Sequence, residues 1–245
     1  MSTAVVVTSG KGGTGKTSLT GGVSSCLAAL GRRVLCIDMD IGLRNLDISL
    51  GLTDRALMDF TDVLEGRCSL KRAAVPHPVI KNLYLLTAPL TLSPGISEER
   101  MKAFLRTARE QYDYILMDSP AGMGEGFRLA ACGADRGIVV STTDTSALRD
   151  AQRVVSLLSR QLPSIHLVVN RVQPKLLRRL HTTIDDAMDA AGLPLLGVVP
   201  EDEQVMLSAN QGKPIILASR KGAAVAYLNI ARRLMGERVP LMHIR

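Results

Sequence analysis

Glycine, lysine and threonine residues near the start of the chain are spaced for binding the phosphate groups of a nucleotide. The stretch TSGKGGTGKT (8–17) contains the pattern G-x-x-x-x-G-K-[ST] between Gly10 and Thr17. Glycines allow backbone N–H groups to turn onto phosphate oxygens, because no Cβ blocks the approach. Lys16 places a positive charge on the β- and γ-phosphates, and the Thr17 hydroxyl can ligate Mg²⁺. The pattern therefore predicts a site for ATP with Mg²⁺. Its candidate nucleotide contacts are Lys11, Gly12, Gly13, Thr14, Gly15, Lys16, Thr17 and Ser18.

Lys11 is a second lysine in this loop, and phosphate binding by the loop itself does not need it. It lies on the bend of the loop, where we expect its side chain to point away from its own phosphate cradle. One interpretation is that Lys11 reaches the nucleotide of a second, facing subunit and stabilises the transferring phosphoryl group, as an arginine finger does. The active species would then be a dimer that encloses two nucleotides. The alternative is an exposed lysine without a role.

Three aspartates follow predicted strands, at the edge of the sheet where a nucleotide would bind. Asp38 and Asp40 end the second strand in IDMDIGLRNLD (37–47), and Asp118 ends a later strand in LMDSPAGMGEG (116–126). Asp118 is expected to hold Mg²⁺ through water, as a Walker B acid does. Asp38 and Asp40 are expected to face the γ-phosphate. The candidate catalytic residues are Lys11, Lys16, Asp38 and Asp40, and the candidate metal site is Thr17, Asp38 and Asp118.

The base of the nucleotide needs protein contacts of its own, and the ends of the last two predicted strands offer them. Asn170 ends its strand in VVNR (168–171), and its amide can form a bidentate contact with adenine. Asn170 can equally cap the following turn. The stretch VPEDEQV (199–205) ends the next strand, and its backbone can wall the base. The candidate contacts on this side are Asn170, Arg171, Pro200 and Asp202.

Alternating strands and helices must position these residues. Apolar runs rich in Val, Ile and Leu predict strands that are buried on both faces. They are expected at 3–9, 33–38, 82–88, 113–120, 136–142, 165–171 and 195–202. Helical periodicity predicts helices at 16–30, 98–111, 146–160 and 221–235, with further helices in the gaps. This order predicts an α/β fold with a mostly parallel sheet, helices on both faces, and a single P-loop NTPase domain over residues 1–245.

Composition and charge limit the class of protein. Hydrophobic residues make up 46% and aromatic residues 3% of the chain, which favours a globular protein with an aliphatic core. The net charge of +7 suits nucleic acid, anionic lipid or an acidic protein, or simply a basic solvated surface. Four cysteines without a C-x-x-C pair indicate small buried side chains in a reducing compartment. Neither a signal peptide nor a membrane span is predicted, so we expect a cytoplasmic or peripheral protein.

The motifs together resemble the MinD/ParA family of ATPases, and within it the branch that determines the septum site in bacteria. KGGTGKT (11–17) matches the deviant Walker A motif of this family, whose extra lysine acts across the dimer. IGLRNLD (41–47) and DSPAG (118–122) match more specific stretches. Further matches are NLYLLTA (82–88), SALRDAQR (146–153), GVVPEDEQV (197–205), SANQGKPI (208–215) and AYLNIARRLMGE (226–237). The resemblance runs from about residue 4 to residue 240.

The resemblance implies an ATPase that binds ATP with Mg²⁺ and forms an ATP-dependent homodimer. It also implies peripheral binding to the inner face of the cell membrane through a short C-terminal amphipathic helix. The implied partners are a MinC-type division inhibitor, which blocks FtsZ ring assembly, and a MinE-type or other topological regulator, which stimulates hydrolysis. By the same resemblance, Lys11 is the signature lysine, Lys16 the phosphate lysine, Thr17 a Mg²⁺ ligand, Asp40 the acid that positions water, Asp38 a second switch acid, Asp118 the Walker B acid and Asn170 an adenine contact.

Two stretches depart from the family pattern. Relatives usually continue for ten to twenty residues past VPLMHIR (239–245), as an apolar and basic amphipathic helix, and that helix is apparently absent here. Membrane attachment therefore follows from the resemblance alone. STTDTSALRD (141–150) lacks a proline that relatives often carry after the strand, so this loop and the partner contacts near it are expected to differ.

Three other functions use the same kind of fold. A ParA-type partition ATPase would bind DNA with its basic surface, although LRRLH (177–181) and RRLMGER (232–238) are the only close basic pairs. An iron–sulfur carrier would need a cysteine pair near the dimer axis, whereas Cys132 stands alone in a suitable region. An amidating synthase would transfer phosphate to a carboxylate substrate, for which the sequence indicates no pocket. The septum-site ATPase is the preferred interpretation, and nucleic acid is not expected among its partners.

Overall fold

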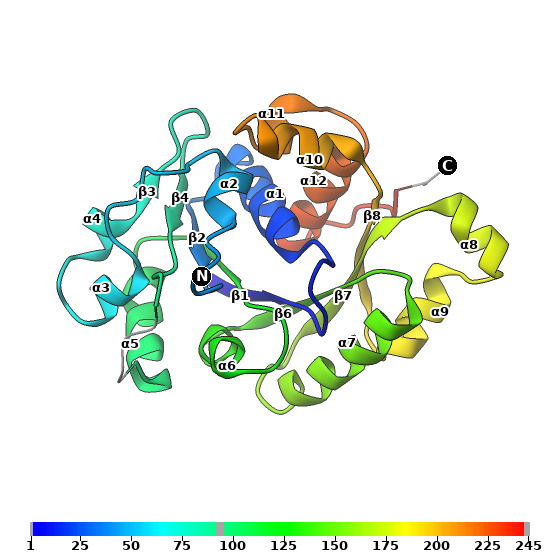
Figure 1. Cartoon of the computed structure of the whole chain (residues 1–245), viewed down its shortest axis with the longest axis horizontal. Helices are drawn as coiled ribbons and strands as arrows, with labels where there is room; N and C mark the ends of the chain where they lie inside the picture. Colours follow the sequence, from blue (N-terminus) through cyan, green and yellow to red (C-terminus); the bar gives the residue numbers. More distant parts are fainter. Residues whose placement is uncertain (1, 92–95, 243–245) are drawn as a thin grey trace.

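A single sheet with helices on both faces forms the framework of the molecule (Figure 1). The computed structural model describes residues 2–91 and 96–242. Among them the strand order is β3-β4-β2-β5-β1-β6-β7-β8, and every pairing is parallel except that of β3 with β4. The strands are β1 (Thr3–Thr8), β2 (Val34–Asp38), β3 (Val75–Pro76), β4 (Leu83–Leu86), β5 (Tyr114–Asp118), β6 (Arg136–Ser141), β7 (Ile165–Val172) and β8 (Leu195–Pro200).

The helices form two layers with separate cores. They are α1 (Lys16–Ala29), α2 (Leu46–Leu50), α3 (Phe60–Leu64), α4 (Leu70–Ala73), α5 (Glu98–Arg109), α6 (Glu125–Ala131), α7 (Thr145–Leu158), α8 (Pro174–Leu180), α9 (Ile184–Ala191), α10 (Glu203–Asn210), α11 (Ile215–Ala218) and α12 (Ala223–Leu234). One core contains side chains of α3 to α7 and α9, and the other contains side chains of α1, α2, α11 and α12. Figure 1 shows α6, α7 and α9 below the sheet and α1, α2, α10, α11 and α12 above it.

The central strand β1 contributes side chains to both cores, because successive side chains of a strand point to opposite faces of the sheet. Ala4 and Val6 pack into the core under α5 to α7, and Val5 and Val7 pack into the core under α1 and α12. This two-sided burial explains why the strand is continuously apolar rather than alternating with polar residues. It also fixes the carboxyl end of β1, from which the phosphate-binding loop begins.

Close packing of α1 against α12 holds the helix that follows the loop. A Cβ at Gly22 of α1 would clash with the ring of Tyr227 of α12, so only glycine permits this approach. Tyr227 is fully buried there. The phosphate-binding loop is therefore supported at one end by the central strand and at the other by a tightly packed helix.

The predicted fold class is confirmed, and seven of the strands lie where apolar runs predict them. Some bounds differ: β4 ends at Leu86, earlier than expected, and β8 ends at Pro200 rather than at Asp202. The antiparallel strand β3 was not predicted, because two residues carry no periodic signal. At the C-terminal end, residues 237–242 form no helix or strand, and the rest of the departing stretch, 243–245, lies outside the described residues. In the part of the chain that the structure describes, no helix is both long and apolar enough to span a membrane.

Candidate nucleotide-binding site

The loop between β1 and α1 has the backbone that phosphate binding requires. Gly15 precedes α1 with φ of +88°, a left-handed conformation that disfavours any side chain. A Cβ at Gly15 would also clash with the side-chain amide of Asn170. The N–H groups at the start of α1 then lack helical partners and carry the positive end of the helix dipole. The predicted strand–loop–helix context is thus present, and it suits an anion.

Lys16 carries a buried positive charge without a close counterion. Its Nζ donates a hydrogen bond to Ser9 Oγ at 3.0 Å, and Ser9 Oγ donates to the carbonyl oxygen of Lys11 at 2.7 Å. Among the described residues no carboxylate forms an ion pair with Lys16, which is only 8% exposed. Burial lowers the pKa of Lys16, and the charges of Asp118 and Asp40 oppose that shift. A buried ammonium of this kind is stabilised by a bound anion, as a phosphate group would be.

Asp38 and Asp118 lie side by side at the ends of the neighbouring strands β2 and β5. Both are 1% exposed, and burial raises the pKa of Asp38 to about 6 and that of Asp118 to about 7. Hydrogen bonds from the Thr17 and Thr20 side chains partly offset the shift of Asp118. Two buried carboxyl groups next to each other favour a nearby cation. The structure therefore brings the predicted residues Thr17, Asp38 and Asp118 together.

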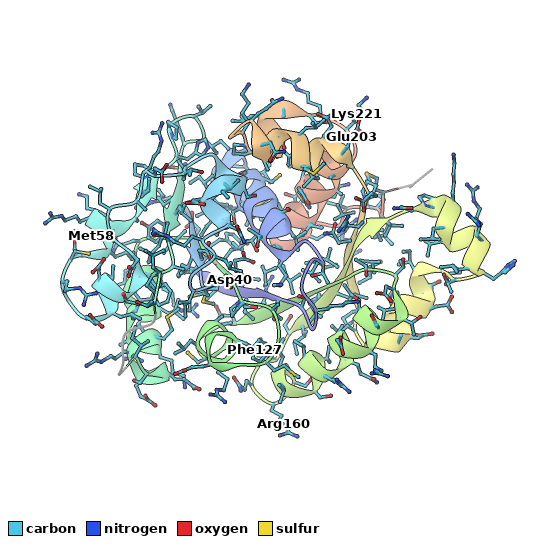
Figure 2. All side chains as sticks on the ribbon, in the orientation of Figure 1. Asp40, Met58, Phe127, Arg160, Glu203 and Lys221 are labelled. Carbon is cyan, nitrogen blue, oxygen red and sulfur yellow. The ribbon has the colours of Figure 1, made fainter. Side chains whose placement is uncertain are left out.

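The carboxylate of Asp38 already has backbone partners. Its Oδ1 accepts from the N–H of Asp40 at 2.9 Å and its Oδ2 from the N–H of Leu46 at 3.1 Å. Asp38 thereby shapes the loop between β2 and α2. Asp40 on this loop is only half-buried, and the described residues form no hydrogen bond to its carboxylate. It lies near the centre of the molecule in Figure 2 and is close enough to Lys16 to interact electrostatically. Asp40 is thus available for a ligand or water, whereas a metal-binding role for Asp38 stays a prediction.

Mg²⁺ suits the donor set at the ends of β1, β2 and β5. The described residues contain no group of three or more His, Cys, Asp or Glu side chains that could hold a metal alone. Mg²⁺ is usually bound by one or two protein oxygens, phosphate oxygens and water rather than by an all-protein cage. The Thr17 hydroxyl at the start of α1 and the Asp118 carboxylate at the end of β5 provide such oxygens. The arrangement fits a metal that arrives with the nucleotide.

Lys11 points away from its own loop, as its place on the bend predicts. Its Nζ lies 3.2 Å from Asp144 Oδ2 and 2.8 Å from Ser146 Oγ, at the first turn of α7. Asp144 is also the N-cap of this helix and accepts from the N–H of Ser146 at 3.0 Å. The Lys11 side chain is 48% exposed, so this contact is open to solvent. The two lysines of the loop therefore have different surroundings: Lys16 is enclosed and Lys11 is at the surface.

The residues predicted to contact adenine support the phosphate-binding loop. Asn170 Nδ2 donates to the carbonyl oxygen of Thr14 at 2.8 Å, and Arg171 Nη1 donates to that of Gly13 at 3.3 Å. Arg171 also pairs with Glu201 at the end of β8, with Nε to Oε2 at 2.9 Å. The described residues form no hydrogen bond to the side-chain oxygen of Asn170. Contact with adenine stays a prediction for Asn170 and Arg171.

Pro200 and Asp202 lie at the end of β8 and just beyond it. Asp202 Oδ1 accepts from the N–H of Gln204 at 3.0 Å and caps α10. Its Oδ2 accepts from the N–H of Ala223 at 2.9 Å, at the start of α12. The Asp202 side chain is therefore used to join two helices. Any contact of Pro200 or Asp202 with a base stays a prediction.

Several residues that contribute to the site could not be predicted from the sequence, because they belong to no recognisable motif. Ser9 links the two lysines, Asp144 and Ser146 hold Lys11, and Glu201 pairs with Arg171. Thr20 could have been noticed, because it follows Thr17 by three residues and therefore lies on the same side of α1. The other contacts join segments that are distant in the sequence.

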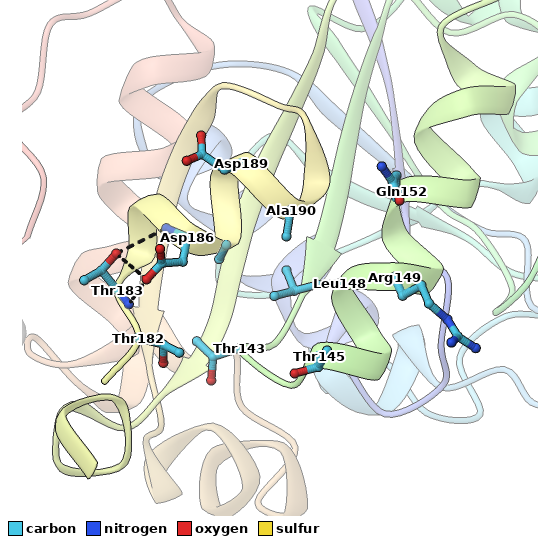
Figure 3. A pocket seen from close by; sticks show the side chains of 11 residues that line it. Thr143, Thr145, Leu148, Arg149, Gln152, Thr182, Thr183, Asp186, Asp189 and Ala190 are labelled. Carbon is cyan, nitrogen blue, oxygen red and sulfur yellow. Dashed lines mark hydrogen bonds between the residues drawn. The ribbon is translucent and has the colours of Figure 1, made fainter. Parts of the chain in front are cut away.

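A separate pocket borders the first turn of α7 (Figure 3). It has a volume of about 520 Å³ and lies between α7 and α9, with Leu148 on one side and Ala190 on the other. Thr145 of its lining directly follows Asp144, which holds Lys11. The pocket contains none of the predicted nucleotide contacts. It is a feature of the α7–α9 surface rather than of the phosphate-binding loop.

Comparisons with family models, with curated sequences and with solved structures all point to the same protein family. Residues 5–215 match the domain family described as CobQ/CobB/MinD/ParA nucleotide binding domain. The septum site-determining protein MinD of Bacillus subtilis (strain 168) is 41% identical over 246 residues, which cover 98% of this chain and 92% of that protein. The solved MinC:MinD cell division protein complex of Aquifex aeolicus matches with a TM-score of 0.92 and 39% identity, covering 99% of each chain. MinD of Pyrococcus horikoshii in complex with Mg-ADP matches with a TM-score of 0.83 and 28% identity, covering 96% of each chain.

Proposed function

The chain belongs to the CobQ/CobB/MinD/ParA family of nucleotide-binding domains, and from this premise we propose that it is a MinD-type ATPase acting in bacterial division-site selection. It hydrolyses ATP to ADP and phosphate in the presence of Mg²⁺. ATP binding converts it into a homodimer, and hydrolysis returns it to the monomer. The nucleotide therefore sets the oligomeric state, and the oligomeric state sets which partners bind.

The observation that carries this proposal is the contrast between the two lysines of one loop. The buried ammonium of Lys16 lacks a carboxylate partner among the described residues and is positioned for the phosphates of its own nucleotide. Lys11 is at the surface, held by groups that it can leave at little cost, because an exposed ion pair is screened by solvent and contributes little to stability. A surface cation next to a phosphate site is suited to a nucleotide bound by a second copy of the chain.

Each residue of the site has a distinct part in the proposed reaction. Lys16 and the loop N–H groups bind and orient the phosphates, and Lys11 of the facing copy stabilises the negative charge that develops during transfer. Asp40, whose carboxylate accepts no hydrogen bond from the described residues, orients the attacking water. Thr17 and Asp118 would hold Mg²⁺, which neutralises charge on the phosphate oxygens. Asp38 keeps the Asp40 loop in place through its two backbone hydrogen bonds.

The partners follow from the relatives and are part of the proposal. The Aquifex aeolicus MinD in the MinC:MinD complex resembles this chain over nearly its full length, which supports a MinC-type division inhibitor as partner. A MinE-type or other topological regulator would accelerate hydrolysis. The dimer would gather at the inner face of the cell membrane. Residues 1–245 would act in this as one ATPase domain.

A binding assay with a MinC-type protein tests the proposed function. The chain is purified and mixed with a MinC homologue, and complex formation is measured with ATP, with ADP and without nucleotide. Hydrolysis of ATP is followed in parallel with Mg²⁺ and with EDTA. The proposal predicts Mg²⁺-dependent hydrolysis and a complex that forms with ATP but not with ADP. Hydrolysis that requires an added carboxylate substrate, with no MinC complex, would contradict it in favour of a metabolic enzyme.

A further inference from the structure

Thr20 of α1 has a buried hydroxyl group that contacts Asp118, the carboxylate expected to bind Mg²⁺. Its Oγ1 lies 3.2 Å from Asp118 Oδ1 and 3.0 Å from the carbonyl oxygen of Lys16. Both Thr20 and Asp118 are essentially inaccessible to solvent. The Asp118 carboxylate is therefore shielded from bulk solvent, and among the described residues the Thr20 hydroxyl is a side-chain hydrogen-bond partner of it. The phosphate-binding helix and the end of β5 are joined at this point.

Helical geometry explains why Thr20 is placed for this contact. Residues three apart on a helix lie on the same side, so Thr17 and Thr20 both face the end of β5. The Thr17 side chain lies close enough to Asp118 to lower the pKa of that carboxyl. Thr17 is expected to give its oxygen to Mg²⁺, whereas Thr20 lies one turn further along α1 and its hydroxyl contacts the carbonyl oxygen of Lys16 and the carboxylate of Asp118. Thr20 is thus the hydroxyl that can hold Asp118 in the same orientation with and without the metal.

We propose that Thr20 is a positioning residue for Mg²⁺: it fixes one oxygen of Asp118, so that the carboxylate is already oriented when the metal arrives with ATP. The inference rests on the proposed ATPase function. Threonine in a helix often bonds the carbonyl four residues earlier without any further role. The distinguishing observation is the second contact, to a buried carboxylate at the site. Thr20 has one hydroxyl proton and two acceptors in reach, and its role at the metal site requires that this proton is donated to Asp118 Oδ1 when the carboxyl is ionised. Residues that orient a metal's ligands typically contribute about 10–100-fold to metal affinity or activity.

The test compares three variants in nucleotide binding, which does not depend on turnover. Thr20→Val keeps the branched shape and removes the hydroxyl, whereas Thr20→Ser keeps the hydroxyl. Ser25→Ala is the matched control, because Ser25 is fully buried on the same helix and bonds the carbonyl of Gly21 at 2.7 Å without contacting an acid. Binding of a fluorescent ATP analogue is titrated at increasing Mg²⁺ concentration and in EDTA. Thermal unfolding checks that each variant is folded.

The inference predicts that Thr20→Val raises the Mg²⁺ concentration for half-maximal tight binding by about tenfold. Affinity in EDTA should stay within about twofold of the wild type, since the phosphate contacts are intact. Thr20→Ser and Ser25→Ala should behave as the wild type. If Thr20→Val does not fold, Thr20→Ala is used, since it removes the hydroxyl without forcing a second methyl group against Asp118.

An unchanged Mg²⁺ requirement in the hydroxyl-free variants would overturn the inference, and so would an equal shift in Ser25→Ala. Loss of affinity in EDTA to the same extent as with Mg²⁺ would also overturn it, because the hydroxyl would then act on the loop rather than on the metal site. A wild-type chain that binds the ATP analogue equally with and without Mg²⁺ would instead contradict the proposed function itself. The two failures are therefore distinguishable in one experiment.

Discussion

Lys11 Nζ lies 3.2 Å from Asp144 Oδ2 in the same chain, at the first turn of α7. Ser146 Oγ, at 2.8 Å, completes the contact. If Lys11 acts on the nucleotide of a second copy, it must first leave these two groups. The ion pair is half-exposed, so it stabilises this orientation of the Lys11 side chain only slightly. In the monomer Lys11 is therefore held by weak contacts with Asp144 and Ser146, and little free energy is needed to break them.

The substitution Asp144→Asn should favour the ATP dimer. The new side chain would retain the capping of α7, because asparagine caps a helix as well as aspartate does, but it lacks the charge that holds Lys11. The dimer dissociation constant with ATP should fall by up to about 25-fold, because the pair must break once in each of the two copies and each exposed pair accounts for at most about fivefold. Analytical ultracentrifugation measures this change. Glu98→Gln, which removes an exposed ion pair with Lys102 on α5, is the control and should leave dimerisation unchanged.

Lys16 should be required for function and unfavourable for stability. In Lys16→Met the side chain keeps its length but loses its charge, so nucleotide binding should be abolished. The nucleotide-free variant should be more stable by about 1 kcal/mol, or about 3 °C in Tm, because a buried ammonium without a carboxylate partner has been removed. Isothermal titration calorimetry measures the first effect and differential scanning calorimetry without nucleotide the second. Normal ATP affinity would refute the assignment of Lys16, and a lower Tm would refute the account of its burial.

Asp40→Ala should separate ATP binding from hydrolysis. The described residues form no hydrogen bond to the Asp40 carboxylate, so its removal leaves the loop and the phosphate contacts unchanged. ATP affinity should stay within about threefold of the wild type, while hydrolysis falls by about 100-fold or more, as expected for a group that orients the nucleophile. Single-turnover measurements with radiolabelled ATP give both values. Hydrolysis at the normal rate would exclude Asp40 as the acid that positions water.

The stability of the nucleotide-free chain should depend on pH through Asp118. Its pKa is raised to about 7 by burial, whereas in the unfolded chain it is near the ordinary value of 3.8. Between these values the folded state binds more protons than the unfolded state, so the stability that Asp118 contributes decreases as pH rises. It is fully present below about pH 4 and is lost as pH rises through about 7. Asp38, with a pKa raised to about 6, acts in the same direction.

Comparison with Asp118→Asn isolates this contribution, because other groups titrate in the same range. His77 and His166 have pKa values lowered by burial and act in the opposite direction. The difference in Tm between Asp118→Asn and the wild type should therefore increase from about pH 5 to about pH 8, in favour of the variant. Thermal unfolding at several pH values in EDTA measures it. A difference that is constant with pH, or that decreases, would contradict the assignment.

Local patterns in the sequence were sufficient to find the parts of the site that lie within one segment. The loop from Gly10 to Thr17 has fixed spacing, and the strands that end in Asp38 and Asp118 are marked by apolar runs. Because parallel strands end at one edge of a sheet, these acids could be placed beside the loop from the sequence alone. The same reasoning placed Asn170 at a strand end as a contact for adenine, whereas its hydrogen bond to the carbonyl oxygen of Thr14 in the loop was not predicted.

Contacts between distant segments could not be predicted in the same way. Lys11 and Asp144 are separated by 133 positions, and Thr20 and Asp118 by 98. Which side chains meet across such separations depends on how α7 and α1 pack against the sheet, and one sequence does not encode this in a readable pattern. Helices of four or five residues, such as α2, α4 and α11, are too short to produce a helical period. They form because the surrounding core covers their apolar residues.

Mass in solution tests the central claim, which is that ATP switches the chain from monomer to dimer through Lys11. Multi-angle light scattering is measured with ADP and with ATP, on an Asp40→Ala background that slows hydrolysis, with and without Lys11→Ala. The account predicts that ATP doubles the mass of the Asp40→Ala chain, that ADP does not, and that adding Lys11→Ala keeps the chain monomeric with ATP. A mass that is the same with both nucleotides, or that doubles regardless of Lys11, would contradict the account and leave an ordinary phosphate-binding loop.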